Sequence, residues 1–540
     1  MDDILHRHQL HSEVPVKISS VSAGAVTALF SLARELDVAG QIDRALSGGG
    51  EVQVRAGLTV GESLVAAMIA RACAPRSKRA FADWAGTTYL RDLMKFAAAD
   101  LTSQHFWDQM NVMPLDKLPE IEQALVREVV RIEQLQLRAL AYDTTNFYTH
   151  IATTNLRAEL PQRGHNKQGR HDLRQMGLAL VVDQLTQLPL AHVLYEGARS
   201  DMKTFAEFLK PVRKHLLELT GQPDQLTLVF DAGSSSRQNP EGLATGAVEC
   251  RPSPGQDRPC VFASGLHYVT AVRPSSHRAL LEQAAGELCE VQLSSGATAR
   301  AWRTSRVIAG KRREVVVVFS AKLHAGQLRG LHQTLSKSWR EFEEMGSFAR
   351  TSAETAKRKL EKLRKRQYLR SLFCYRIDQD ATGPFRVSVW SDWLEYQRLD
   401  QRYFGLRVLI TDRAEWTTAQ IIEAYRGQSK VESAFRDLKD PRMLATRPQF
   451  HWTDQKLHVH AFICVMAYLL ITLLHRRAKQ KTTFDGSPRR LLAELAEVRC
   501  CRLIDMTGRK GRPRVRLQLE ETGDDLRTLA ETLGAMPALR

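Results

Sequence analysis

Residues 176–195 read MGLALVVDQLTQLPLAHVLY, so that two apolar runs flank a polar segment at 183–187. Short apolar runs on either side of such a segment predict two β-strands joined by a turn. A third apolar run, 137–142, precedes them in the chain and ends at Asp143. These three runs predict the first part of a β-sheet, with a carboxylate at the end of its first strand.

The chain that follows adds a helix and two further strands. Residues 201–219 carry apolar side chains on one helical face, which predicts an amphipathic helix. The apolar run 225–230 ends at a second carboxylate, Asp231, and residues 267–272 form another apolar run. The resulting β-β-β-α-β order predicts an α/β fold with a mixed sheet.

A third carboxylate, Glu432, lies in the segment 425–439, which reads YRGQSKVESAFRDLK. Tyr425, Glu432 and Lys439 recur at intervals of seven residues, which is nearly two helical turns. One continuous helix, begun by a capping box at 417–420, would therefore carry all three on one face. An ordinary surface helix, in which the glutamate pairs with the arginine four positions later, is the alternative that this segment alone allows.

The overall composition favours a nucleic-acid partner. A chain of 540 residues is too long for one hydrophobic core and indicates two to four domains. The net charge of +17 favours a polyanion, either nucleic acid or an anionic membrane. The longest apolar stretch, 461–474, has 14 residues and is short for a membrane span, and the first residues lack a signal-peptide pattern. We therefore expect a cytoplasmic protein that binds nucleic acid and no membrane.

Several other enzyme classes lack support in the sequence. There is no Walker A loop, no HExxH motif and no nucleophile elbow, which argues against ATP-driven and zinc-protease chemistry. The eight cysteines include no CxxC pair, so neither a zinc ribbon nor a thioredoxin-like motif is indicated. Scattered cysteines are consistent with a reducing compartment.

Basic side chains are concentrated in residues 357–370, which hold eight Lys or Arg residues and one Glu, and again in 509–516. A surface for the DNA backbone is the favoured interpretation, and a solvated helix face is the alternative. The residues of the first stretch that we predict to contact phosphates are Lys357, Arg358, Lys359, Arg364, Lys365 and Arg366.

Carboxylates at the ends of strands are candidates for a metal site, because Mg²⁺ prefers hard oxygen ligands. Two ions held about 3.5–4 Å apart by such side chains activate a nucleophile and stabilise a leaving oxygen. A single aspartate after a strand is more often a turn or cap residue, so Asp143 and Asp231 alone leave the question open.

Four motifs together resemble a known family. They are YDTTNFY at 142–148, HDLRQMGLALVVD at 171–183, LVFDAGSSS at 228–236 and YRGQSKVESAFRDLKD at 425–440. In this order they resemble the bacterial insertion-sequence transposases of the DDE class, in the branch with a Y-x₂-R-x₃-E-x₆-K signature. The resemblance implies an RNase H-like fold and Mg²⁺ or Mn²⁺ as the cofactor.

The resemblance also implies roles for individual residues. It places the catalytic metal ligands at Asp143, Asp231 and Glu432, and it places the signature Tyr and Lys at Tyr425 and Lys439.

One position departs from the family pattern, because Gln428 stands where the signature has an arginine. Another cation would then have to make the phosphate contact expected of that arginine. Arg426 and Lys439 are the candidates. We therefore count Tyr425, Arg426, Gln428 and Lys439 among the predicted DNA-binding residues.

The patterns divide the chain into five parts. We predict a helical DNA-end-binding region at 1–130, the first part of the RNase H-like core at 131–274, and a partly β insertion at 275–400. The second part of the core, with the glutamate helix, would occupy 401–480, and a basic helical region 481–540.

The predicted function is that of a transposase, which cuts the ends of a mobile element and joins the 3′ ends to target DNA. Its partners would be the terminal repeats, the target DNA and a second copy of the chain in a homodimer on DNA. A structure-specific nuclease or resolvase on the same fold, and a non-catalytic DNA-binding regulator derived from a transposase, are the alternatives.

Overall fold

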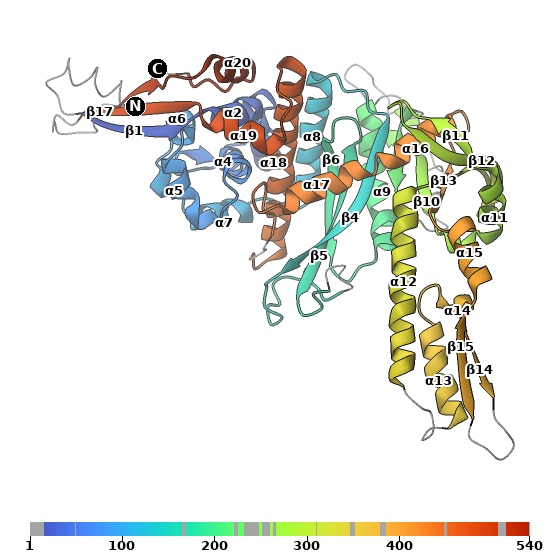
Figure 1. Ribbon diagram of the computed structural model, residues 1–540. Coiled ribbons are helices and arrows are strands. Elements are labelled where there is room, and N and C mark those ends of the chain that lie inside the picture. Colours follow the sequence, from blue (N-terminus) through green and yellow to red (C-terminus); the bar gives the residue numbers. More distant parts are fainter. Residues whose placement is uncertain are drawn as a thin grey trace. The chain divides into compact units, whose positions relative to one another are not determined.

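The computed structural model divides by its internal contacts into two units, and the element labels are those of Figure 1. Unit 1 comprises Met1–Val229, Gln238–Leu266 and Gly427–Arg540, and unit 2 comprises Phe230–Arg237 and His267–Arg426. The structure describes residues 16–48, 50–164, 169–220, 225–231, 248–250, 260–262, 266–308, 310–345, 352–378, 385–447, 451–505 and 515–538.

Unit 1 contains a mixed sheet. Its strands are β4 (Ala139–Thr149), β5 (Arg174–Asp183), β6 (Pro189–Glu196) and β7 (Thr227–Phe230). β5 pairs antiparallel with both β4 and β6, whereas β7 pairs parallel to β4, so the order is β6-β5-β4-β7. The predicted α/β class is confirmed, and this order with α9 (Asp201–Thr220) before β7 is the one expected of an RNase H-like core.

Successive side chains of a strand point to opposite sides of the sheet. A different helix covers each face of β4. On one face, the Tyr142 ring packs against Phe205 and Phe208 of α9, with centroid distances of 4.7 and 5.2 Å. The other face receives α17 (Ser429–Lys439), which lies along β4 in Figure 1.

The first predicted strand is longer than the sequence indicated. We expected it to end at Asp143, but β4 continues to Thr149, so Asp143 lies within the strand. The reason is its pairing with β5, which continues from Asp143 opposite Leu180 to Thr149 opposite Arg174. The polar residues after the aspartate therefore extend the ladder instead of forming a turn.

The N-terminal part of unit 1 is mostly helical, as predicted. The helices are α2 (Gly24–Glu35), α3 (Val38–Ser47), α4 (Val60–Cys73), α5 (Phe81–Gly86), α6 (Leu90–Met94), α7 (Ser103–Asn111) and α8 (Lys117–Ile132). A short hairpin of β2 (Val54–Arg55) and β3 (Leu58–Thr59) precedes α4, and unit 1 also holds the pair β8 (Val248–Cys250) and β9 (Cys260–Phe262).

These helices pack around one long apolar helix, α18 (Asp454–Lys481), which contacts α2, α4 and α7. By length and apolar content α18 is able to cross a membrane, but 94% of its most apolar 18-residue window is buried in the protein. Burying one Leu or Ile side chain completely contributes about 1.5–3 kcal/mol. The apolar stretch 461–474 of this helix is thus the centre of the core.

The C-terminal region is not purely helical, which corrects the prediction for 481–540. Besides α19 (Pro488–Ala496) and α20 (Asp524–Thr532), it contains β17 (Arg499–Asp505) and β18 (Val515–Leu519). These strands form a three-stranded sheet with β1 (Val16–Ser22), in the order β1-β17-β18. Most of the basic stretch 509–516 lies outside the described residues.

Unit 2 contains an antiparallel sheet. Its strands, in spatial order, are β11 (Cys289–Gln292), β12 (Thr298–Ile308), β13 (Lys311–Phe319), β16 (Leu406–Thr411) and β10 (His267–Val272). The helices α11 (Arg278–Glu287) and α16 (Thr418–Arg426) belong to the same unit. The boundaries predicted at 274 and 400 therefore fall inside one compact unit, because β13 pairs with β16.

Helices and a hairpin extend from this sheet and share a leucine-rich core. The helices are α12 (Ala321–Glu344), α13 (Ala353–Arg364) and α14 (Leu369–Leu372). β14 (Phe373–Asp378) pairs with β15 (Arg386–Ser391) and lies beside α13 (Figure 1). The buried core between these elements is Leu331, Leu360, Leu363, Leu369, Leu372, Phe373 and Phe404.

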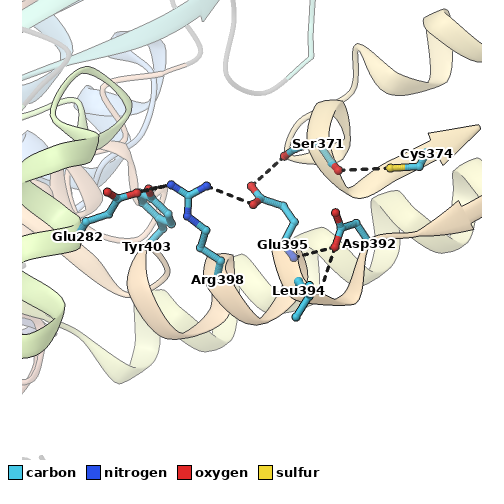
Figure 2. A network of polar contacts seen from close by, with 8 residues as sticks. All are labelled: Glu282, Ser371, Cys374, Asp392, Leu394, Glu395, Arg398 and Tyr403. Atoms are coloured by element: carbon cyan, nitrogen blue, oxygen red, sulfur yellow. Dashed lines mark hydrogen bonds and ion pairs between the residues drawn. The ribbon is translucent and has the colours of Figure 1, made fainter.

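A polar network in unit 2 fixes α15 (Trp393–Arg402) between α11 and α14 (Figure 2). Glu282 of α11 accepts hydrogen bonds from Arg398 and Tyr403, and Arg398 also pairs with Glu395 at 3.4 Å. Ser371 of α14 donates to Glu395 at 3.0 Å. These contacts hold α15 against α11 through Arg398 and against α14 through Glu395.

Candidate active site

Asp143 lies on the face of β4 that α17 covers. Its side chain is half-buried, and its Oδ1 accepts a hydrogen bond from the backbone N–H of Thr144 at 2.8 Å. Thr145 and Phe147 follow at alternate positions and therefore share this face.

Glu432 lies in the first turn of α17 and is exposed. Val431, Phe435 and Leu438 are buried and attach the helix to the sheet. Within the described part of the chain, the Glu432 carboxylate forms no hydrogen bond and no ion pair. Its oxygens are consequently available to an external ligand.

Lys439, at the end of α17, connects the helix to the face that carries Asp143. Its ammonium donates a hydrogen bond to the Thr145 hydroxyl and lies 5.2 Å from the centroid of the Phe147 ring. Thr145 is two residues beyond Asp143, so a positive charge is held beside the strand position of the carboxylate. Sequence spacing did not identify Thr145, although the alternation of side chains along a strand would place it there.

The predicted continuous helix from 417 to 439 is wrong. α16 ends at Arg426 and α17 begins at Ser429, with a turn at Gly427 and Gln428 between them. Gly427 packs closely, since a Cβ there would lie 2.1 Å from Oε1 of Gln184. Tyr425 and Glu432 therefore do not lie on one face of a single helix.

Gln428 is buried, with 7% of its surface exposed, and its Nε2 donates to the Tyr142 carbonyl at 2.7 Å. A single helix over 417–439 would place position 428 on the face of Tyr425 and Glu432. The turn points it inward instead, onto the residue before Asp143. No sequence pattern signals this contact, because it joins segments almost three hundred residues apart.

Tyr425 and Asp231 belong to unit 2 and are joined there. The Tyr425 hydroxyl donates to Asp231 Oδ1 at 2.9 Å, and Arg407 lies 5.1 Å from the centroid of the tyrosine ring. Asp231 is exposed at the end of β7, as predicted, while residues 232–236 of its motif lie outside the described residues. Arg426, the last residue of α16, is exposed.

The capping box predicted at the start of α16 is confirmed. Gln420 N donates to the Thr417 hydroxyl at 3.2 Å, and Thr417 N donates to Gln420 Oε1 at 2.8 Å.

Titration in this region is governed by burial. Burial raises the pKa of Asp437 to about 6, with Arg436 opposing and Asp440 adding to the shift. Burial likewise raises the pKa of the Tyr142 phenol, which keeps it neutral. Neither group was singled out from the sequence.

The donor set of the predicted ligands suits a hard cation. Asp143, Asp231 and Glu432 offer only carboxylate oxygens, which Mg²⁺ and Mn²⁺ accept. Asp143 and Glu432 lie in unit 1 and Asp231 in unit 2. Among the residues described by the structure, no three His, Cys, Asp or Glu side chains are gathered as a metal site. The metal and its ligands accordingly remain predictions.

The basic residues of α13 and of the turn that follows it are of two kinds, those held in ion pairs and those that are exposed. Arg364 pairs with Glu361 at 2.8 Å, and Arg366 donates to Ser338 at 2.7 Å and pairs with Glu341. The other predicted phosphate contacts are exposed, namely Lys357, Arg358, Lys359 and Lys365. The two arginines support the local fold, whereas the exposed residues are open to a polyanion.

This division leads to a test on DNA binding. Replacing Lys357, Arg358 and Lys359 together with Gln should lower the slope of log affinity against log salt by about 1 for each true phosphate contact. Replacing Arg366 with Gln should reduce the stability of unit 2 with little effect on that slope. Binding isotherms over a range of salt, with thermal unfolding as the companion measurement, would separate the two. An unchanged slope in the triple variant would show that this face of α13 is only solvated.

No protein-family model and no curated protein matches the chain. Among solved structures, the chain is similar to the piggyBac transposase in its synaptic complex with hairpin DNA, determined by cryo-EM. The TM-score is 0.39 and the sequence identity 9%, over 87% of this chain and 79% of that one. Similarity at this level establishes neither a shared family nor a shared activity.

Proposed function

We propose that this protein is a DDE-type DNA transposase. The observation that carries the proposal is the packing of α17, which bears Glu432, on the face of β4 that bears Asp143. A mixed sheet in the order β6-β5-β4-β7 supports it, because it supplies the frame that such a site requires.

The sequence supports the inclusion of Asp231. It directly follows the apolar strand β7 and stands in the motif LVFDAGSSS at 228–236, at the position where the resembled family has its second aspartate.

In the proposed reaction, Asp143, Asp231 and Glu432 would hold Mg²⁺ or Mn²⁺, and such ions would supply an activated water and stabilise the leaving oxygen. Hydrolysis of a phosphodiester at the element end leaves a 3′-OH. That hydroxyl then attacks a phosphodiester of the target, so that one P–O bond forms as another breaks. Because P–O bonds are exchanged, the joining step needs no ATP. Lys439 would contribute positive charge beside the phosphate.

The partners in this proposal are DNA and a second copy of the chain. Two element ends must be joined together, so we expect at least a homodimer on DNA. Sizing of the protein–DNA complex checks this, and concerted joining of two ends by a complex with a single protomer would contradict it.

The experiment that tests the function uses a labelled element end, Mg²⁺ and a target plasmid. The DNA on either side of the gene, searched for inverted repeats, provides the end sequence. Joined product is the expected result. Cleaved ends without joining would indicate a nuclease or resolvase, and a stable complex without cleavage would indicate a DNA-binding regulator.

A further inference from the structure

A pocket of about 600 Å³ in unit 1 is lined by an excess of positive charge. It lies between the end of α4, the segment 75–79, the start of α7 and the segment that leads into α18. Its cationic side chains are Arg71, Arg76, Lys78, Arg79 and Arg447. None of the described residues that line it is Asp or Glu.

Four of these charges have no carboxylate partner among the described residues. Within the residues that the structure describes, Arg71, Arg76, Lys78 and Arg79 form no ion pair. The nearest polar partner of the Lys78 ammonium is Nε2 of His451, at 3.4 Å. Positive charges that are gathered and partly desolvated without counter-charge lower the stability of a protein unless a ligand neutralises them.

The pKa of Lys78 reflects this positive charge without a counter-charge. Burial, aided by the positive charges of Arg71 and Lys456 and opposed by Cys464, lowers the pKa of Lys78 to about 7. Burial also holds the pKa of His451 and of His460 well below the usual range, so both imidazoles are neutral at pH 7.

The pocket is connected to the strand that carries Asp143. Arg447, in its wall, lies 5.2 Å from the centroid of the Tyr148 ring on β4. Tyr148 is five residues beyond Asp143, which corresponds to about 17 Å along a strand. Five positions along a strand place Tyr148 on the opposite face of β4 from Asp143, so this contact joins the pocket wall to the strand and not to the face that carries the carboxylate.

We propose that this pocket binds a phosphate group of the DNA backbone. Guanidinium and ammonium groups converging from α4 and the segment after it suit a phosphate, which accepts several charge-assisted hydrogen bonds. That the phosphate belongs to DNA rests on the proposed function, whereas a free phosphate compound would share the same chemistry.

The test uses the full-length protein, a labelled DNA duplex and inorganic pyrophosphate as a small probe. Lys78→Met and Arg76→Gln are the variants, since Arg76 is exposed and its replacement should leave the fold intact. Lys117→Met is the matched control, because Lys117 pairs with Glu120 on α8 away from the pocket. Thermal unfolding and DNA affinity as a function of salt are measured for each.

Pyrophosphate should raise the Tm of the wild-type protein, because a ligand that binds the folded state stabilises it. Each pocket variant should lose this shift, bind DNA about tenfold more weakly, and show a salt slope lower by about 1. Lys78→Met should also raise the Tm of the unliganded protein, because it removes a half-buried cation without a counter-charge. The control should behave as wild type.

The pH dependence of DNA affinity distinguishes a Lys78 that binds phosphate from a lysine that only supports the fold. The charged groups facing it are Arg71 and Lys456, while His451, His460 and Cys464 are neutral near pH 7. The ammonium is charged below its pKa, so DNA affinity should fall as pH rises through about 7. The fall approaches tenfold per pH unit at most, and Lys78→Met should remove it.

Wild-type DNA affinity and salt slope in both pocket variants would overturn the proposal. If pyrophosphate still raised the wild-type Tm in that case, the occupant would be a free phosphate compound and the assignment to DNA would be wrong. These outcomes are distinct from failure of the proposed function, in which the wild-type protein binds DNA through the pocket but neither cleaves nor joins it.

Discussion

Replacing Asp143 or Asp231 with Asn, or Glu432 with Gln, should reduce strand cleavage by roughly a thousandfold or more, because several kcal/mol of transition-state stabilisation depend on the metal. Each replacement keeps the size of the side chain and removes only the negative charge. The fold and the affinity for an element end should therefore persist. Cleavage is measured as a single-turnover rate on pre-bound DNA, with binding and thermal unfolding determined for the same preparations.

Glu128→Gln is the matched control, because Glu128 is a carboxylate of α8 that pairs with Arg131 outside the proposed site. It should cleave at the wild-type rate. Near-normal cleavage by any one of the three variants would remove that residue from the metal site. Loss of DNA affinity in parallel with cleavage would instead assign the residue to binding.

Replacing Lys439 with Met should lower the cleavage rate by about 10- to 100-fold, which corresponds to the roughly 1.5–3 kcal/mol of a hydrogen bond to a charged group. The reason is its position, since its ammonium binds Thr145 on the same face of β4 as Asp143. Gln428→Ala should act differently. It removes the hydrogen bond to the Tyr142 carbonyl and should cost about 0.5–1.5 kcal/mol of stability, with a smaller effect on the rate.

Single-turnover cleavage and denaturant unfolding distinguish the two residues. Lys430→Met, a lysine on the same helix with no ion pair to any residue in the described part of the chain, is the control for loss of charge. A rate defect in Gln428→Ala as severe as that of Glu432→Gln would show that the glutamine takes part in the chemistry. A wild-type rate in Lys439→Met would show that this lysine only attaches α17 to the sheet.

The sequence names the residues of the candidate site, which stay a prediction, but it does not give their geometry. The positions of the three carboxylates come from motifs along the chain, and the helical spacing of Glu432 and Lys439 is kept in α17. The sequence does not predict the contacts of Tyr425 and Gln428. Both side chains bond to partners far away in sequence, Asp231 and the Tyr142 carbonyl.

Local patterns determined the elements of the core. The apolar runs and the turn at 183–187 correspond to β5 and β6, and the amphipathic segment 201–219 corresponds to α9. Such patterns work because side chains two, three or four residues apart share a face of a strand or helix. Burial of the run at 461–474 followed equally well from its uninterrupted apolar composition.

Tertiary contacts decided the features that sequence alone left wrong. β4 passes through Asp143 because β5 continues to pair with it, although its residues beyond 143 resemble a turn. β17 forms at the far end of the chain because β1 offers it an edge. The helix predicted across 417–439 breaks at Gly427 because that glycine packs closely on Gln184 and turns Gln428 onto β4. Each outcome depends on a partner distant in sequence, whose hydrogen bonds and close packing outweigh local preference.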